Sequence, residues 1–188
     1  SLEPARMQIN ASLPRPHPHF RDAVRLRVHG LFFDCHQGAH DVKNKVALVT
    51  VPFFLSRAAM PYLRNSKGVI INIASDWGLV GGRNAVAYCA SKGGLVLMSK
   101  AMALDHAAEG VRINAVCPGD VETPMLYRSG AAHGLDEQSA LREANASSRT
   151  GRVTTAAEVA ALVAFLASDE AAQITGAAIP IDGGNTAA

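Results

Sequence analysis

The chain has 188 residues and a mass of 19.7 kDa, with 48% hydrophobic residues, 18% charged residues and a formal net charge of +2, which suits one domain with a sizeable core. The near-neutral charge offers no basic face for nucleic acid, and no apolar stretch is long enough for a membrane span, so we expect neither partner. The absence of a secretory leader pattern and three widely spaced cysteines, Cys35, Cys89 and Cys117, predict a cytoplasmic protein without a disulfide framework.

The first 45 residues differ in composition from the rest of the chain. They hold four of the nine prolines and five of the seven histidines, and the run PRPHPH at 14–19 cannot enter a helix or a central strand. Only residues 21–33 alternate in a way that favours a strand. We therefore expect residues 1–45 to form an atypical leader and residues 46–188 to form the folded domain.

Histidines in this leader have spacings that are found in zinc sites. His17 and His19 stand two apart, and His36 and His40 stand four apart beside Cys35. No second tight pair is placed to complete a tetrahedral site, so we predict no metal, and a metal-binding module is the weakest of the functional hypotheses.

From residue 46, strand and helix patterns alternate. The short runs of apolar, mostly β-branched residues predict strands at 68–74, 111–117 and 177–181. The intervening segments predict helices at 52–64, at 86–108, twice within 124–147, and at 154–168. Strands separated by helices indicate a parallel sheet with crossover helices, which is a doubly wound α/β fold, and we expect the first of these strands to be buried on both faces.

Tyr88, Lys92 and Ser75 are the residues that could carry chemistry. Tyr88 and Lys92 stand four apart in the 86–108 helix, so they share one face, and a lysine cation there would lower the tyrosine pKa toward the range of an acid–base catalyst. Ser75 follows the 68–74 strand, at the edge of a parallel sheet where ligands bind. The ordinary alternatives are a helix surface pair and a Ser-Asp turn or helix cap.

These residues and their flanks resemble the short-chain dehydrogenase/reductase family. The family places a tyrosine thirteen residues after its serine and a lysine four residues later, as Ser75, Tyr88 and Lys92 stand here. The segments that also resemble family motifs are NIASDWGLVGG around the serine, YCASKGGL in the helix, RINAVCPGDVETPM at 112–125, and GRVTTAAEVAALVAFLASDEAAQITGAAIPIDGG at 151–184. The resemblance covers residues 52–186, and it implies a Rossmann-like fold.

The resemblance implies an oxidoreductase that transfers a hydride between NAD or NADP and an alcohol or ketone. Tyr88 would be the acid–base, Lys92 would lower its pKa and hold the nicotinamide ribose, and Ser75 would polarise the substrate oxygen. The residues that would contact the cofactor are Tyr88, Lys92, Pro118, Gly119, Val121 and Thr123. The family also pairs helices 52–64 and 86–108 between subunits, which implies a homo-oligomer.

The resemblance also reveals a gap. The family binds the dinucleotide pyrophosphate through a glycine-rich turn after its first strand, and this chain has no such turn. Residues 45–50 resemble that strand, but Val51 and Pro52 follow instead of glycine, so about two βαβ units are missing and the fold is expected to be incomplete at its N-terminal half. The catalytic asparagine of the family would fall at Leu48.

Two functions of different classes follow. One is the family oxidoreductase. The other is a truncated family member that binds no dinucleotide and acts as a non-catalytic oligomerising or structural chain. The substrate is not readable, because the segment that would set it, residues 124–147, varies freely in such folds.

Overall fold

The structure, a computed structural model, describes residues 27–28, 31–32 and 45–187. The chain divides into two compact units, residues 1–40 and 41–188. In the first unit, β1 (Arg27–Val28) and β2 (Leu31–Phe32) pair in antiparallel fashion. The leader side chains considered as zinc ligands lie outside the described residues, and the described part of the chain contains no group of three potential ligands that could hold a metal ion.

The second unit is built on a three-stranded parallel sheet. Its strands β3 (Val69–Ile73), β4 (Arg112–Pro118) and β7 (Ala178–Ile181) are ordered β3–β4–β7, so β4 is central. The prediction of three parallel strands that neighbour one another in one sheet is therefore confirmed. Because the strands are parallel, their carboxyl ends meet at one edge of the sheet.

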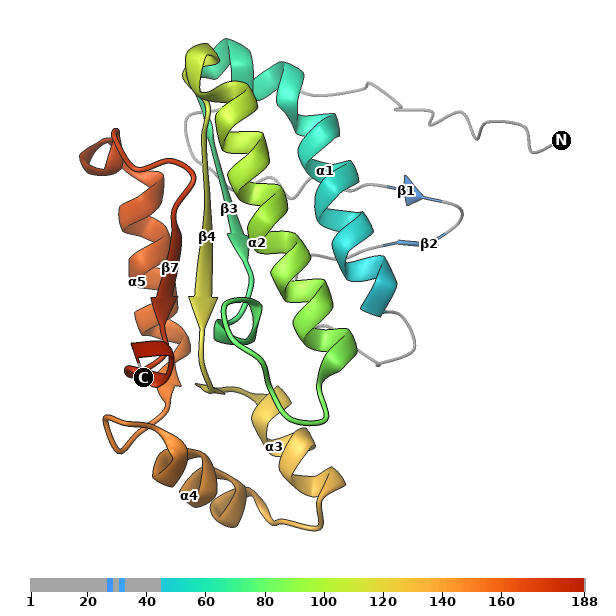
Figure 1. Cartoon of the computed structure of the whole chain (residues 1–188), viewed down its shortest axis with the longest axis vertical. Helices are drawn as coiled ribbons and strands as arrows, with labels where there is room; N and C mark the ends of the chain where they lie inside the picture. The colour runs from blue at the N-terminus through green and yellow to red at the C-terminus, as the bar shows by residue number, and fades with distance from the viewer. Residues whose placement is uncertain (1–26, 29–30, 33–44, 188) are drawn as a thin grey trace, which may run out of the picture. The chain divides into compact units, whose positions relative to one another are not determined.

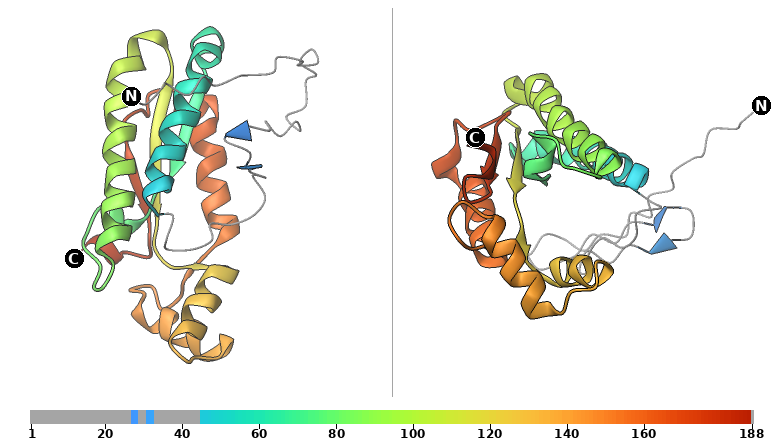
Figure 2. Two further views of the ribbon diagram at one scale, coloured as in Figure 1. Left: turned by 90° about the vertical axis from the view of Figure 1, so that its right-hand side faces the viewer. Right: turned by 60° about the horizontal axis from the view of Figure 1, so that its bottom comes forward.

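Helices cover both faces of this sheet (Figures 1 and 2). On one face lie α1 (Lys45–Ser66) and α2 (Val86–His106), and on the other lies α5 (Ala156–Ala167). Two shorter helices, α3 (Pro124–Ala132) and α4 (Glu137–Ser147), lie beyond the carboxyl end of β4. The doubly wound arrangement is confirmed, with a sheet that is small for such a fold.

The core follows β4. Ile113, Ala115, Val116 and Cys117 are fully buried, with side chains that alternate between the two helical layers. Cys117 packs with α2 through Leu95 and is part of the core. On the other face, Val116 packs against Leu166 of α5 and Ala171, so the central strand joins both layers.

The outer strand β3 is less buried than predicted. Its residues are only partly buried, and Ile73 keeps 45% of its surface exposed. The reason is that β4 covers one edge of β3, whereas no strand in the described part of the chain pairs with its other edge. Both faces of β3 are packed, with Ile70 on the side of α1 and α2 and Ile71 on the side of α5, but the burial is only partial.

The predicted start of the first helix was also wrong. Residues 45–50, which resemble a first strand, form the first turns of α1, so Pro52 and Pro61 both lie inside the helix. A strand here would need a neighbour for its backbone groups, whereas a helix pairs most of them internally. The helix ends after Ser66, where Lys67 adopts a positive φ of 52°.

Local end signals in the sequence agree with the structure. Thr155 caps α5 in a capping box with Glu158, and Gly110 follows α2 and the short helix η3 (Ala107–Glu109) at φ 78°. One feature was not predicted: β5 (Val121–Glu122) and β6 (Thr154–Thr155) form a second, two-stranded parallel sheet. Within the described ranges, none of the helices has the length and apolarity needed to cross a membrane.

Candidate active site

Ser75 is held at the carboxyl end of β3 by a short turn. The backbone N–H of Ala74 makes the last sheet contact, to the Val116 carbonyl at 2.7 Å, and the short helix η2 (Asp76–Gly78) begins directly after Ser75. Ser75 caps η2, because its Oγ accepts a hydrogen bond from the Trp77 N–H at 3.2 Å. The expected cap role and the expected position at the sheet edge are thus both present in one residue.

Glycines place this turn directly on α2. A Cβ atom at Gly78 would stand 2.9 Å from the backbone carbon and oxygen of Lys92, so only glycine lets η2 approach the helix this closely. A Cβ atom at Gly82 would stand 2.6 Å from the Trp77 ring. The motif around Ser75 therefore has a packing reason for two of its glycines, and it brings Ser75 to the helical turn that carries Tyr88 and Lys92.

The side chains of Ser75 and Tyr88 hydrogen-bond to each other. The Tyr88 ring also packs edge-on against Trp77, with ring centroids 6.0 Å apart and planes at 84°. Burial raises the pKa of Tyr88 above its ordinary value of 10.0, and the Ser75 hydrogen bond lowers it in part, whereas the carboxylates of Asp76 and Asp120 raise it further. The tyrosine is therefore neutral at pH 7.

This direction corrects the expectation that Lys92 lowers the Tyr88 pKa. Lys92 does lie beside the tyrosine, with Nζ 5.7 Å from the ring centroid, but Nζ donates a hydrogen bond to the Ile73 carbonyl at 3.1 Å. Burial lowers the pKa of Lys92 itself. The loss of water around the phenol is the largest influence on the Tyr88 pKa, which is raised although Lys92 lies nearby.

The other predicted site residues lie at the same edge of the sheet. Pro118 is buried at the end of β4, and Gly119 packs so closely that a Cβ atom would stand 3.0 Å from Asp182 Cα. Val121 lies in β5, and Thr123 precedes α3 and donates its hydroxyl to the Val121 carbonyl at 3.2 Å. Parallel strand ends therefore gather these residues on the side that carries Ser75.

Sequence reasoning missed Asp76 and Asn185. The Asp76 side chain is almost fully buried, and its Oδ2 accepts a hydrogen bond from Asn185 Nδ2 at 2.8 Å. The two residues stand 109 positions apart, so no local pattern links them. Only the Ser-Asp pair was a visible signal, and it was interpreted as a turn.

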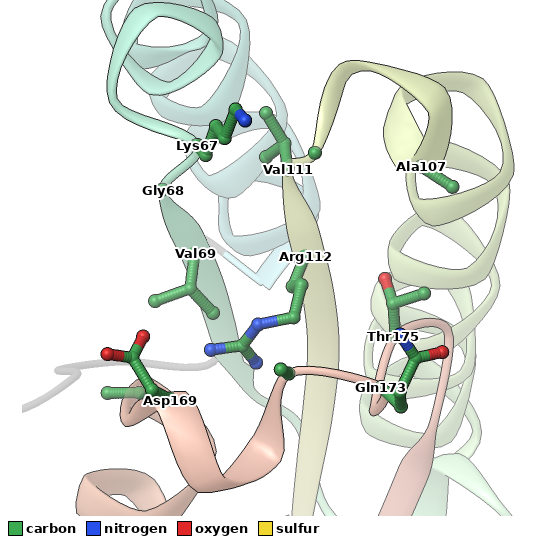
Figure 3. A pocket seen from close by; sticks show the side chains of 12 residues that line it. Lys67, Gly68, Val69, Ala107, Val111, Arg112, Asp169, Gln173 and Thr175 are labelled. Atoms are coloured by element: carbon green, nitrogen blue, oxygen red, sulfur yellow. The ribbon is translucent and has the colours of Figure 1, made fainter.

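A pocket of about 480 Å³ opens at the opposite edge of the sheet (Figure 3). It is lined by Lys67, Val69, Arg112 and Thr175, among others. The Arg112 guanidinium donates to the carbonyls of Leu166 at 2.7 Å and Ser168, so it satisfies the end of α5. This pocket holds none of the predicted site residues.

The described residues fit only one end of a nicotinamide dinucleotide. Lys92 has further ammonium protons beyond the one given to Ile73, and Thr123 offers a hydroxyl oxygen at the same edge. A pyrophosphate needs backbone N–H groups at a glycine-rich helix start, but the segment expected to carry them lies within α1. The nicotinamide end is provided for in residues 45–187, and the pyrophosphate end is not.

Comparison with known proteins identifies related dehydrogenases and reductases. A family model described as enoyl-(acyl carrier protein) reductase matches residues 24–186. Over 136 residues the chain is 47% identical to meso-2,3-butanediol dehydrogenase of Serratia marcescens, covering 71% of this chain and 51% of that protein. Over 132 residues it is 42% identical to L-fucose dehydrogenase of Bos taurus, covering 70% and 48%. The chain thus spans about half the length of these curated relatives.

Solved structures resemble this fold over about four fifths of the chain. The ligand-free aldohexose dehydrogenase of Thermoplasma acidophilum superposes with a TM-score of 0.71 at 31% identity, covering 80% of this chain and 62% of that one. A 4-hydroxyisoleucine dehydrogenase mutant complexed with NADH and succinate superposes with a TM-score of 0.67 at 29% identity, covering 77% and 58%. In each case the chain covers less than two thirds of the solved protein.

Proposed function

Because the chain belongs to the short-chain dehydrogenase/reductase family, we propose that it carries the proton-transfer part of an alcohol dehydrogenase site, with Tyr88 as the acid–base. The reaction is hydride exchange between NAD or NADP and an alcohol or ketone. The placement of Ser75 beside Tyr88 and Lys92 at the carboxyl edge of a parallel sheet, with Lys92 Nζ 5.7 Å from the Tyr88 ring centroid, is the observation that carries the proposal. The names of the relatives, which are dehydrogenases of a diol and a sugar, support alcohols as the substrate class.

The protonation of Tyr88 favours the acid role. Its raised pKa keeps the phenol proton in place at pH 7, so Tyr88 is ready to donate to a ketone oxygen as that oxygen gains negative charge. Ser75 Oγ stands beside the phenol and polarises the same oxygen. The nicotinamide, when bound, supplies or accepts the hydride.

The neighbouring residues position the reactants. Lys92, fixed by the Ile73 carbonyl, would hold the nicotinamide ribose with its remaining protons. The Pro118–Gly119 turn, Val121 and Thr123 would hold the nicotinamide ring and its carboxamide, and would thereby set which face of the ring meets the substrate.

A second function rests on a different observation. The segment expected to carry the phosphate-binding turn is helical, and apolar side chains of α2 remain in water, with exposed fractions of 83% for Val86, 67% for Leu97 and 83% for Leu104. These features suit an oligomerising chain without catalytic activity. The assembly of the chain is then its role, and Tyr88 is idle.

A chimera separates the two functions. Residues 1–50 are replaced by the N-terminal half of the Serratia marcescens butanediol dehydrogenase, which supplies a dinucleotide-binding half. We expect turnover of 2,3-butanediol that falls at least about 100-fold on Tyr88→Phe, because general acid–base catalysis is worth that much. Tyr62→Phe is the matched control, since Tyr62 lies in α1 with 61% of its surface exposed and is none of the proposed site residues. A folded chimera that binds NADH and is unaffected by Tyr88→Phe would contradict the catalytic proposal.

A further inference from the structure

Asp76 is a buried carboxylate that the proposed mechanism does not yet use. It exposes only 6% of its surface, and Oδ1 accepts hydrogen bonds from Ser75 Oγ at 2.9 Å and from the Trp77 N–H at 2.7 Å. Its other oxygen, Oδ2, accepts the amide of Asn185 at 2.8 Å. Among the described residues no cation forms an ion pair with it. Neutral donors therefore hold both oxygens of Asp76 in place.

The proton count at Ser75 fixes the direction of its hydrogen bonds. A serine hydroxyl has one proton, and here Ser75 gives that proton to Asp76. Its oxygen already accepts the Trp77 N–H. The hydrogen bond between Ser75 and Tyr88 lowers the Tyr88 pKa, which is the effect of a hydroxyl that donates to the phenolate, so Tyr88 and Asp76 draw on the same Ser75 proton.

We infer that Asp76, anchored by Asn185, is a positioning residue that takes the Ser75 proton and so controls whether Ser75 can donate to the Tyr88 oxygen. The inference rests on the proposed function, and it joins Tyr88, Ser75 and Asp76 in one hydrogen-bonded chain. Ser75 can donate to a substrate oxygen, or to a Tyr88 phenolate, only by withdrawing its proton from Asp76. Asp76 thus competes with the phenolate for one proton.

The other charged groups around Tyr88 do not replace this role. Lys92 is bonded to the Ile73 carbonyl, and Cys89 accepts the Gly82 N–H. Burial raises the pKa of Cys117. The pKa of Asp120 is raised, first by burial of its carboxyl group and then by the charge of Asp76, although Asp120 as a whole residue is exposed. Among the carboxylates of the described residues, Asp76 is the one hydrogen-bonded to Ser75.

The test is the pKa of Tyr88 in the chain itself, without cofactor. It is measured from the ζ-carbon resonance of labelled tyrosine, which Tyr88→Phe assigns, and circular dichroism reports folding at each pH. Asp76→Asn keeps the shape and removes the charge, so Ser75 becomes free to donate to the phenolate. We expect the Tyr88 pKa to fall by about one unit, a tenfold change in the phenolate equilibrium.

The matched control is Asp105→Asn, which removes a carboxylate from the same helix as Tyr88 but does not bear on the Tyr88 pKa. We expect it to change that pKa by less than about 0.2 unit. A folded Asp76→Asn variant with the wild-type Tyr88 pKa would overturn the inference, since a merely structural Asp76 would leave the tyrosine unchanged.

Two further variants separate positioning from charge and from misfolding. In a Ser75→Ala background, Asp76→Asn should shift the Tyr88 pKa by less than half as much, because the shared proton is gone. An undiminished shift would mean that Asp76 acts by charge alone, which contradicts the inference. If Asp76→Asn does not fold, Asn185→Leu leaves the carboxylate but removes its anchor, and a smaller fall is expected. No fall in a folded Asn185→Leu variant would also count against the inference.

This readout is independent of turnover. The Tyr88 pKa is measured in the chain without dinucleotide or substrate, so it tests the role of Asp76 even if the chain is not an enzyme. If the proposed function is wrong, the chimera will instead show turnover that Tyr88→Phe does not change.

Discussion

At the scale of single residues, desolvation decides the chemistry of Tyr88. Burial removes the water that would stabilise a phenolate, and the nearby Lys92 ammonium group donates a hydrogen bond to the Ile73 carbonyl. The result is a proton donor rather than a ready base. Alcohol oxidation, which needs the phenolate, is therefore expected to require a more alkaline pH than ketone reduction.

The same shift predicts how stability changes with pH. The folded-state pKa of Tyr88 is raised above 10.0, so the neutral form stabilises the fold fully below about pH 10, and that contribution is lost as the pH rises through the folded-state pKa. We expect Tyr88→Phe to lose less stability than the wild type between pH 9 and 11. Urea unfolding at several pH values in this range measures it, and equal slopes for the two proteins would contradict the prediction.

At the scale of elements, the contact between η2 and α2 depends on Gly78. Gly78→Ala would press a Cβ atom against the Lys92 backbone, which cannot move as a side chain can, so we expect a loss of about 1–3 kcal/mol in the free energy of unfolding. Gly81→Ala, three residues later, is the control, because nothing lies within 4 Å of its added Cβ atom. Chemical denaturation of both variants measures the difference. Equal stabilities would show that the turn does not rest on this contact.

Elements whose signals are local were predictable from the sequence. The strands around β4 are short apolar runs between turns, and the Thr155 capping box marks the start of α5 within four residues. The resemblance of residues 45–50 to a strand was misleading, because a short apolar run suits either a strand or a helix and only a neighbouring strand decides between them. The partial burial of β3 could not be predicted for a similar reason, since the burial of a strand depends on what lies across its outer edge.

The candidate site, too, was predictable from the sequence only in part. Ser75, Tyr88 and Lys92 follow from two fixed intervals, which a strand end and a helix convert into proximity. Asp76 and Asn185 meet only because the C-terminal segment after β7 returns to the same edge as β3. The direction of the Tyr88 pKa shift depends on burial, which no interval in the sequence reports.

At the scale of the whole molecule, the apolar surface of α1 and α2 predicts association. Phe53, Phe54 and Leu55 of α1 are exposed together with Leu97 and Leu104 of α2, and a monomer would leave this area in water. We expect a homo-oligomer through these two helices, observed by sedimentation at micromolar concentration. A monomeric wild type would contradict this expectation.

A charge on this surface tests which face is used. Leu104→Glu should convert the oligomer to a monomer, because the side chain is 83% exposed in the single chain and would be buried on association. Phe165→Glu places the same charge on α5, on the opposite face of the sheet, and should leave the oligomer intact. The reverse pattern would assign the interface to α5 instead.

The last prediction concerns dinucleotide binding by this chain. Without a glycine-rich turn the pyrophosphate loses its backbone donors, and what remains is a few hydrogen bonds from residues such as Lys92 and Thr123, each worth about 0.5–1.5 kcal/mol net. Association costs at least about 4 kcal/mol in lost translational and rotational freedom. These quantities nearly cancel, so we expect NADH and NADPH to bind no tighter than roughly millimolar.

Reduced nicotinamide mononucleotide distinguishes a weak site from an incomplete one. If only the nicotinamide end is held, removing the adenylate half costs nothing, and calorimetry should give dissociation constants for NADH and the mononucleotide within about threefold of each other, a difference of less than about 0.7 kcal/mol. Turnover by the chain would then be close to background, and Tyr88→Phe would change it little. Micromolar binding of NADH, with turnover abolished by Tyr88→Phe, would contradict this, because the pyrophosphate would then have found donors outside residues 45–187.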